Sequence, residues 1–380
     1  MSSDTSSLKV TRNYKFRIYP NKEQERKLSR WLEVCRWIYN SALSLRKEAW
    51  AEEKRSVTRT EQQVWLKEAK KDKNNCFLRE VHSQVAQDVL FRVERAFQGF
   101  FRRVKTEDKP GYPRFKGKGR YRSLTFTQFG EGLGACFKNG KLKLSKIGLV
   151  KIRMHRDIPG TVKTVIIKKE ATGKWYAVLA VEIALTQAVI HPGSAVGLDV
   201  GLEKFVALSD GKVIENPRYL RKTEKKLKHA QRSLSRKQKG SRNRGKARLK
   251  VARLHARVSN QRKDFLHKET RKLVSCYGLI AVEDLNIHGM VKNHHLAKSI
   301  SDAGWNSFLS MLCYKAEEAG SRVLRVNPSR TSQECSRCGK TVPKELSTRM
   351  HRCPSCGLVL DRDVNAARNI LARALAQEVA

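Results

Sequence analysis

The spacing of apolar residues in the first half of the chain changes twice, which predicts a β domain with a helical insert. Residues 8–20 alternate loosely between apolar and polar side chains, as in a strand that ends at a proline. Between residues 21 and 105, apolar side chains recur every three or four positions, as in helices, most clearly over 28–43 and 85–101. Short apolar runs with turns between them follow over 110–190 and predict a small β barrel or sheet that includes the first strand.

The second half opens with the linker-like segment HPGSA at 191–195, followed by three short predicted strands. An Asp-Gly pair at 210–211 predicts a hairpin between the second and third strands, and three such strands are typical of the start of a ribonuclease H-like sheet. Residues 218–275 form a long, very basic helical stretch, which we expect the glycines at 240–245 to break into two antiparallel helices. The remaining pattern predicts a strand at 277–286, a mobile loop at 286–299 that contains His294 and His295, a helix at 305–320 that ends at a glycine, and a strand at 321–327.

Charge restricts the function more than any other property of the composition. The chain has 79 Lys and Arg against 36 Asp and Glu, and the excess of +43 is spread along its whole length, where it opposes compaction by self-repulsion. A polyanion, most simply nucleic acid, would relieve that repulsion. A basic solvated surface or binding to an anionic membrane is the alternative. We disfavour it because basic stretches recur in every region instead of forming one tail or patch.

Length, apolar content and cysteine number set further limits. A chain of 380 residues fits two or three domains, and an apolar fraction of 40% is enough to build their cores. No run of about 18 apolar residues indicates a membrane span, and the polar N-terminus lacks the apolar core of a signal peptide. The nine cysteines do not form a disulfide framework, which indicates a reducing compartment.

Four cysteines near the C-terminus have the spacing of a zinc site. They form two C-x2-C pairs, Cys335/Cys338 and Cys353/Cys356, separated by 14 residues, with a glycine after each pair. Four thiolates leave no open coordination position, so the Zn²⁺ would be structural. His351 could replace a cysteine as a ligand, but we favour the all-cysteine set, with His351 as a surface or nucleic-acid contact. The other five cysteines are best explained as small apolar residues.

Three carboxylates lie in apolar contexts that are unusual in so basic a chain. Asp199 lies within GLDVG, Glu283 within LIAVEDLN, and Asp363 opens the predicted helix DVNAARNILARALA. Mg²⁺ prefers carboxylate oxygens, and two such ions can hold the attacking and leaving oxygens of phosphoryl displacement. The three residues therefore predict a phosphodiester-cleaving Mg²⁺ site, with Mn²⁺ as an alternative ion. A surface pair at Glu283 and helix capping by Asp361 or Asp363 are the alternative explanations, and Asp361 is the second choice for the third carboxylate.

Together these segments resemble the TnpB family of transposon-encoded RNA-guided nucleases, which are related to the type V CRISPR effectors. The resemblance is carried by YKFRIYPNKEQERKL, PGYPRFKGKGRYRSLTF, GLDVG, VEDLN and TSQECSRCG…HRCPSCG…LDRDVNAARNI, and it covers nearly the whole chain. It implies an α+β multidomain protein, in which a wedge β-barrel with a helical recognition insert precedes a RuvC (ribonuclease H-like) α/β nuclease domain with an inserted zinc ribbon. It also implies that Asp199, Glu283 and Asp363 are the catalytic residues of a single RuvC site.

The composition shifts and the resemblance together set the expected domain boundaries. The wedge barrel takes residues 1–20 and 108–192, with the helical recognition domain at 21–107 between them. The RuvC domain takes 193–331, including the basic helical hairpin 218–275, and resumes at 360–380 after the zinc ribbon at 332–359.

Candidate nucleic-acid contacts follow from residue type and position. In an RNA-guided nuclease the RNA reads the sequence, while Lys and Arg hold the backbone and a few side chains read a short adjacent motif. Glutamine can pair with adenine, threonine can touch a thymine methyl group, and aromatic rings among basic residues can stack on bases. The candidates are Gln84, Gln87, Thr125 and Thr127 for the motif, Lys116, Arg122, Arg236, Arg242, Arg248 and Arg262 for the backbone, and Tyr112, Phe115, Tyr121 and Phe126 for stacking. A polar helix face, a solvated charge run or barrel core explains the same residues without nucleic acid.

The expected function is an RNA-guided, metal-dependent DNA endonuclease of an insertion-sequence element. The resemblance implies a guide RNA from the transposon end, double-stranded target DNA cut on both strands, a monomer with one RNA, no membrane partner, and a cytoplasmic, nucleoid-associated location in a prokaryotic host. Some family members have lost acidic residues and act as RNA-guided DNA-binding regulators, and the complete triad favours the enzyme over that alternative. A DNA transposase would need DNA-end recognition and usually a dimer, and a guide-independent nuclease for branched DNA would not need the long N-terminal half.

Overall fold

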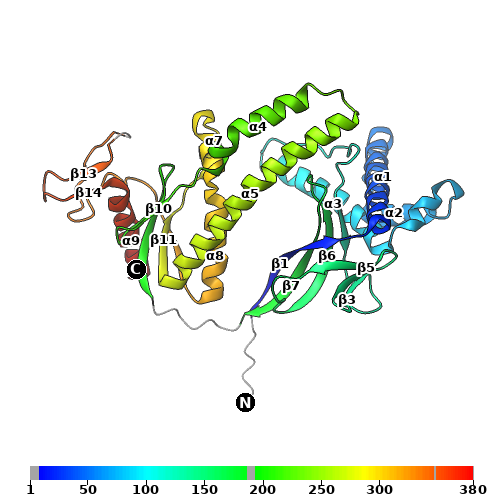
Figure 1. Ribbon diagram of the computed structural model, residues 1–380, viewed down its shortest axis with the longest axis horizontal. Coiled ribbons are helices and arrows are strands. Elements are labelled where there is room, and N and C mark those ends of the chain that lie inside the picture. The colour runs from blue at the N-terminus through cyan, green and yellow to red at the C-terminus, as the bar shows by residue number, and fades with distance from the viewer. Residues whose placement is uncertain (1–7, 186–192, 346–347, 380) are drawn as a thin grey trace, which may run out of the picture. The chain divides into compact units, whose positions relative to one another are not determined.

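The structure is a computed structural model that describes residues 8–185, 193–345 and 348–379. It divides into two compact units between residues 184 and 185, and each unit is described by itself (Figure 1). Residues 1–7 of the expected first barrel segment and 191–192 of the expected linker lie outside the described residues. None of the described helices is both long and apolar enough to cross a membrane.

The first unit contains a seven-stranded sheet that is nearly closed into a barrel (Figure 1). Its strand order is β2-β6-β7-β1-β5-β4-β3, so the first strand of the chain lies in the middle of a sheet formed by much later residues. This confirms the prediction that the strand at 8–20 joins the strands between 110 and 190. The strands are β1 (Leu8–Tyr19), β2 (Ser123–Phe126), β3 (Ala135–Lys138), β4 (Lys141–Leu144), β5 (Gly148–Arg153), β6 (Thr161–Lys169) and β7 (Trp175–Leu185).

Helices occupy the chain between β1 and β2, as the three- and four-residue spacing predicts. They are α1 (Lys22–Glu53), α2 (Arg59–Ala69), the 3-10 helix η1 (Lys73–Glu80) and α3 (Ser83–Lys105). Asn21 begins α1 with a capping box, because the side chains of Asn21 and Gln24 each accept a hydrogen bond from the other's backbone amide. The apolar faces of α1 and α3 share one core with the sheet, in which Leu28, Val89 and Phe126 are fully buried.

The second unit contains a five-stranded sheet of order β10-β9-β8-β11-β12. The strands are β8 (Ser194–Val200), β9 (Lys204–Leu208), β10 (Val213–Glu215), β11 (Tyr277–Glu283) and β12 (Arg322–Val326). β8, β9 and β10 form antiparallel hairpins, with the predicted turn at Asp210-Gly211 between the last two, whereas β11 is parallel to both β8 and β12. Parallel neighbours need crossover connections, which here are helical.

Both helical crossovers differ in part from the sequence predictions. The first is the basic hairpin of α4 (Tyr219–Ser235) and α5 (Arg242–Cys276), which lie side by side (Figure 1). Its break is confirmed at 236–241, but Gly245 lies inside α5. The second contains α6 (Ile287–Met290), α7 (His294–Ala303) and α8 (Trp305–Ala319), so the predicted loop at 286–299 is largely helical. Asparagine side chains cap both short helices, a local signal that the loop prediction overlooked.

The chain ends with a small two-stranded ribbon and a long helix. β13 (Met350–Arg352) pairs antiparallel with β14 (Val359–Asp361), and α9 (Arg362–Val379) follows at once. α9 packs on β8 and β11, where Ile370 and Ala374 join Ala281 and Val326 in a small core. The C-terminal helix is therefore part of the sheet domain that begins far earlier in the sequence.

Candidate active site and metal centre

Asp199 and Glu283 lie at the ends of neighbouring parallel strands. In the register of β8 and β11, Leu198 is opposite Val282, and the next residue of each strand is a carboxylate. Parallel strands end at the same edge of a sheet, where side chains from different strands can form one site. Leu198 and Val282 are buried, so the cores on which they pack fix the position of both carboxylates.

The third carboxylate, Asp363, comes from the first turn of α9 and reaches the same edge because α9 packs directly on β8. Gly197 allows this close packing. A Cβ atom at position 197 would lie 2.0 Å from the carbonyl oxygen of Ala367 and 2.9 Å from the amide nitrogen of Leu371. Any side chain there would displace α9. The sequence singled out GLDVG for its aspartate, and only the approach of α9 explains its first glycine.

Asp361 and Asp363 have different surroundings. Asp361 Oδ1 accepts hydrogen bonds from the amides of Asp363 at 3.0 Å and Val364 at 3.3 Å, so Asp361 caps α9. Its Oδ2 pairs with Lys204 Nζ at 2.6 Å. Burial would raise the pKa of Asp361, but the Lys204 contact and the two amides outweigh it and lower that pKa. The carboxylate of Asp361 is therefore used for helix capping and ion pairing, whereas Asp363, which pairs with the adjacent Arg362 at 3.4 Å, lines a cavity.

A cavity of about 1180 Å³ in the second unit is lined by all three carboxylates, Asp199, Glu283 and Asp363. The structure thus brings the predicted triad together. The remaining acidic residues of the wall are ion-paired: Glu203 with Arg349 at 2.6 Å, Glu224 with Lys298 at 2.5 Å, and Asp302 with Arg262 at 2.7 Å. The wall also includes Arg218, Arg221, Arg362 and His295. Of the two histidines in the predicted loop, His295 therefore faces the site.

Asp199 differs from the paired carboxylates around it, because its side chain forms no hydrogen bond or ion pair with any residue that the structure describes. Burial is the largest cause that raises its pKa, followed by the negative charges of Glu283 and Asp363, and the charge of Arg362 offsets them only in part. Burial also raises the pKa of Glu283, against a hydrogen bond from Thr331. A half-buried, mutually repelling set of carboxylates is stabilised by a cation, so this donor set fits a divalent metal ion.

The three carboxylates are less tightly grouped than the cysteines. Among the residues that the structure describes, the four cysteines are the only group of three or more His, Cys, Asp or Glu whose ligand atoms all lie within 4.8 Å of one another. The carboxylates instead line the wall of a wider cavity. This spacing leaves room between them for a metal ion together with water or a phosphate oxygen.

A hydrogen-bonded segment that the sequence did not indicate connects Glu283 to α9. Thr331 Oγ1 donates to Glu283 Oε1 at 2.5 Å. The carbonyl of Thr331 accepts a hydrogen bond from Asn369 Nδ2 at 2.8 Å, and the carbonyl of Glu334 accepts from both Asn369 and Asn365, at 2.8 and 2.7 Å. The i, i+4 spacing places both buried asparagines on one face of α9. In the sequence, the only indication of these contacts is the pair of asparagines within an alanine-rich helix.

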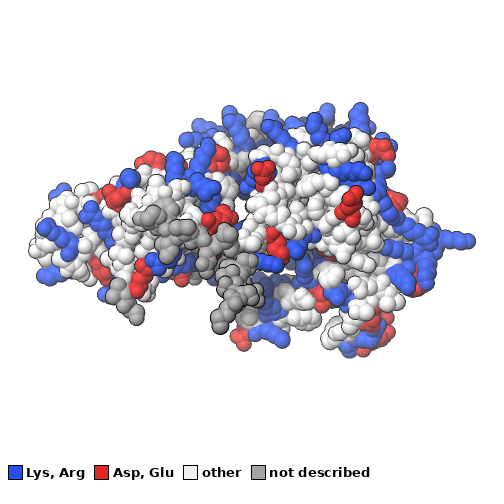
Figure 2. All heavy atoms as spheres, turned by 90° about the horizontal axis from the view of Figure 1, so that it is seen from below, with Lys and Arg blue, Asp and Glu red and all other residues white. Residues whose placement is uncertain are grey.

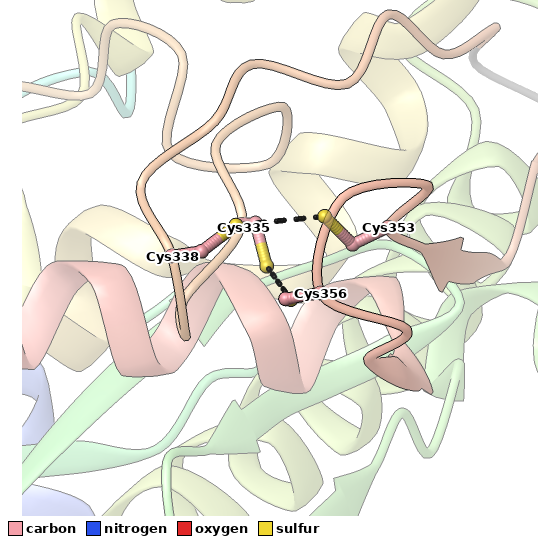
Figure 3. Close-up of side chains that lie close together, drawn as sticks. All are labelled: Cys335, Cys338, Cys353 and Cys356. Atoms are coloured by element: carbon pink, nitrogen blue, oxygen red, sulfur yellow. Dashed lines mark hydrogen bonds between the residues drawn. The ribbon is translucent and has the colours of Figure 1, made fainter.

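The four cysteines form a compact cluster, with Sγ–Sγ distances of 3.6 Å for Cys335–Cys356 and Cys338–Cys353 (Figure 3). The two C-x2-C turns have the same backbone design. In each, the glycine after the second cysteine has a φ near 70° and its amide donates to the carbonyl of the first cysteine. The pKa of Cys353 is lowered to about 6, chiefly because the backbone amide of Cys356 donates to its sulfur. These features fit a tetrahedral four-thiolate site such as that of structural zinc.

The prediction that His351 is a surface or nucleic-acid contact is wrong. His351 is fully buried, and its Nδ1 contacts Lys344 Nζ. Its strand, β13, alternates between exposed and buried residues, and position 351 falls on the buried face. It is not part of the compact ligand group of cysteines.

The candidate nucleic-acid contacts divide into accessible and engaged residues. Arg122, Arg236, Arg242, Arg248, Gln87 and Thr127 are exposed. Four other candidates already have partners within the protein. Gln84 is half-buried and donates to Gln128 at 2.6 Å, and Thr125 is buried and accepts from Arg92 at 2.6 Å. The backbone of Lys116 is held by Asn40, and Arg262 is paired with Asp302. Tyr121 and Phe126 belong to the core, whereas Tyr112 and Phe115 are exposed. Lys and Arg are spread among uncharged residues over the face seen in Figure 2, with Asp and Glu in small groups between them.

Three family models match the chain. One described as "Probable transposase" matches residues 178–294, one described as "Cas12f1-like, TNB domain" matches 305–370, and one described as "Helix-turn-helix domain" matches 8–55. The last range here contains the strand β1 and the single helix α1 in its described residues, rather than two helices joined by a turn.

Two curated relatives match nearly the whole chain. "Putative RNA-guided DNA endonuclease" of Streptomyces pristinaespiralis is 40% identical over 375 residues, which cover 97% of this chain and 90% of the relative. "Putative RNA-guided DNA endonuclease InsQ" of Escherichia coli (strain K12) is 34% identical over 381 residues, with 96% and 92% covered. A solved structure of "the mini-RNA-guided endonuclease CRISPR-Cas_phi3" is 10% identical with a TM-score of 0.48, covering 97% of this chain and 92% of that one.

Proposed function

This chain belongs to the TnpB family of transposon-encoded RNA-guided DNA endonucleases, and we propose that it is itself an RNA-guided, metal-dependent endonuclease that cuts double-stranded DNA beside a short adjacent motif. The family relation supports the guide RNA and the DNA target. One observation carries the cleavage: the half-buried carboxylate of Asp199 has no partner among the described residues and lines a cavity with Glu283 and Asp363, while the other acidic residues of that wall are ion-paired.

We assign Asp199, Glu283 and Asp363 as the catalytic residues and as the ligands of two Mg²⁺ ions, which Mn²⁺ could replace. When bound, the metal would stabilise the charge on the attacking and leaving oxygens of the phosphodiester. The surrounding residues orient the ligands. The Thr331 hydroxyl holds one oxygen of Glu283, and Asp361 fixes the start of α9 so that Asp363 faces the cavity.

Basic residues of the same wall would hold the DNA strand. Arg221 is exposed at the start of α4 and lines the cavity, and its side chain has no hydrogen-bond or ion-pair partner among the described residues, so its guanidinium is available to a phosphate. Further along this hairpin, exposed Arg236, Arg242 and Arg248 would hold the backbone of the guide–target duplex. This assignment supports the interpretation of the basic helices as a binding surface for a polyanion.

The cysteine cluster is proposed as a structural zinc site. Cys335, Cys338, Cys353 and Cys356 supply four thiolates, which complete a tetrahedral shell and leave no position for a substrate. Its role would be to fold residues 332–359, the proposed zinc ribbon, between two parts of the nuclease domain.

We interpret the remaining architecture in the terms of the family. The seven-stranded sheet would belong to the wedge barrel, the proposed domain of residues 1–20 and 108–192, and residues 21–107 would be the recognition domain. Residues 193–331 and 360–380 would form the RuvC domain, with its antiparallel β8–β10 and parallel β11 and β12. The protein would act as a monomer with one guide RNA, on nucleoid DNA in the bacterial cytoplasm.

Two other functions are weaker candidates. An RNA-guided binding regulator would not need three carboxylates in one cavity, so the triad argues for cleavage. A DNA transposase is suggested only by one matching family model, which is described as "Probable transposase". A transposase would break or join DNA strands without RNA.

The decisive experiment is purification of the protein from cells that also carry its native flanking DNA. The bound RNA is sequenced, and the complex is incubated with Mg²⁺ and a library of targets with randomised flanks. We expect one discrete RNA and cutting beside a defined motif, and we expect Asp199→Ala to bind RNA and target normally without cutting. Discrete RNA with no cutting by the wild type would support the regulator, and cutting by RNA-free protein would support the transposase.

A further inference from the structure

An exposed aromatic cluster lies at the C-terminal end of α3 in the first unit. Phe97, Phe100, Phe101 and Tyr112 contact one another with ring centroids between 5.2 and 6.3 Å apart. Phe97 is buried and anchors the group, whereas Phe101 is 54% exposed and Tyr112 is 41% exposed. Rings this exposed contribute little to a protein core, so their position needs another explanation.

Phe115 extends this surface. Its ring is 50% exposed, and Lys47 Nζ lies 4.7 Å from the centroid of Phe115 and 5.3 Å from that of Tyr112. The ammonium group of Lys47 therefore lies beside both rings. We refer to Phe101, Tyr112 and Phe115 as the aromatic platform.

The segment that carries two of these rings is fixed at both ends, although it has no regular secondary structure. Arg103 donates to the carbonyl of Gly111 at 3.1 Å, on one side of Tyr112. Asn40 holds both backbone groups of Lys116, accepting from its amide at 2.8 Å and donating to its carbonyl at 3.1 Å. The backbone is thus held by hydrogen bonds while the rings between the two anchors remain accessible. Such pre-ordering reduces the entropy lost when a ligand binds.

The charge around the platform indicates the chemistry of its ligand. Residues 100–120 contain eight Lys and Arg but only two acidic residues, Glu107 and Asp108. An apolar surface that served another protein would not need such a dense positive charge, whereas phosphate groups would neutralise it. Exposed rings beside cationic groups are the usual surface for unpaired bases, because the rings bind the faces of the bases while the cations bind the backbone.

We propose that the aromatic platform stacks on an unpaired or helix-end base of the nucleic acid bound by the first unit. This inference rests on the proposed function, because it requires a bound nucleic acid. The shared chemistry is a nucleobase next to phosphates, and the base could come from the guide RNA or from the target DNA.

Leucine substitutions test the proposal, because leucine keeps apolar area but removes the flat π surface. Phe115→Leu and Tyr112→Leu are compared with Phe115→Trp, which enlarges that surface. Phe137→Leu is the matched control, because Phe137 is also partly exposed but lies on β3, outside the basic segment. The full-length proteins are first titrated with the RNA that co-purifies with the wild type. The RNA complexes are then titrated with a target duplex from the library. Both titrations are made at several salt concentrations.

We expect each leucine variant to bind roughly 5- to 100-fold more weakly, as for loss of stacking on one base, with Phe115→Trp and Phe137→Leu close to the wild type. The slope of log affinity against log salt should not change, because no charge is removed. Weakened RNA binding would identify the RNA as the source of the base, and weakened target binding alone would identify the DNA. Phe115 makes no ring contact within the cluster, so its variant stays informative if Tyr112→Leu unfolds.

Wild-type affinity in both leucine variants would overturn the proposal. If Phe115→Ala binds more weakly than the wild type while Phe115→Leu does not, the proposal also fails, because that result indicates an apolar contact without base stacking. If the wild type itself binds neither RNA nor target, the proposed function fails first, and this outcome is separate from the other two.

Discussion

Gly197→Ala is the most direct test of how the candidate active site is assembled. The new methyl group would lie 2.0 Å from the carbonyl oxygen of Ala367, whereas an ordinary contact needs at least 3.4 Å. The clash is with backbone, so no side-chain rotamer can relieve it, and α9 must move by about 1.4 Å, the difference between these distances. Asp363 lies in the first turn of that helix and moves with it.

The size of this displacement sets the expected effects. A misplacement of about 1 Å can reduce the rate of a positioned reaction by roughly 100-fold, so we expect DNA cleavage to fall at least that far. Overpacking of this kind costs about 1–3 kcal/mol of unfolding free energy. For a unit of this size the melting temperature should fall by roughly 2 to 12 °C. Guide RNA and target binding should change little, because the substitution removes no charge and lies between β8 and α9.

The assay measures single-turnover cleavage, target affinity and thermal unfolding of the RNA complex. Gly245→Ala is the matched control, because position 245 lies inside α5 and no heavy atom comes within 4 Å of an added Cβ. We expect that control to cleave normally and to gain up to about 1 kcal/mol of stability. Wild-type cleavage and an unchanged melting temperature for Gly197→Ala would refute the packing of α9 on β8 and, with it, the assignment of Asp363.

Three further predictions concern neighbouring residues. Asp361→Asn keeps a good helix cap and loses only the Lys204 ion pair, so we expect its DNA cleavage rate to stay within a few-fold of the wild type. Asp363→Asn should abolish cleavage, and the reverse result would exchange the roles of the two aspartates. Thr331→Val should raise the Mg²⁺ concentration needed for half-maximal cleavage by about 10- to 100-fold, whereas Thr331→Ser should need the same concentration as the wild type. Equal Mg²⁺ curves for Thr331→Val and the wild type would rule out a positioning role for the hydroxyl. Cys338→Ser should release the bound Zn²⁺, as measured by elemental analysis, and lower the melting temperature; a zinc-free, fully active and stable variant would contradict a structural role.

Much of the second unit could be predicted because its signals are local. The apolar runs of β8 and β11 have carboxylates at their ends, and the two cysteine pairs have matched spacing and matched glycines. Local pattern also predicts the helical insert after β1, whose first helix begins at Asn21 with a capping box. In each case one short segment is enough to predict the structure, because its residues contact each other or lie on the same face of one helix or strand.

The parts that could not be predicted depend on contacts between distant segments. Asp361 and Asp363 are equivalent by composition, and only the contacts of Lys204 and the shape of the cavity separate them. Gly197 gains its importance from a helix about 170 residues later in the chain. His351 was expected at the surface once the four cysteines were taken as the zinc ligands, whereas the alternation of a three-residue strand buries it.

The cysteine ribbon interrupts the nuclease domain, and the structure indicates why the interruption does not separate the three carboxylates. The segment that enters the ribbon is tied to α9 through Thr331 and Glu334, whose carbonyls accept hydrogen bonds from Asn369. The segment that leaves it ends at Asp361, which caps the same helix. Both ends of residues 332–359 are therefore held by α9. Long loops without their own structure are unfavourable in a compact domain, and a bound metal would close this one into a folded ribbon. Zinc binding and the position of Asp363 are thus linked through one helix, so loss of the metal from the ribbon should also reduce DNA cleavage.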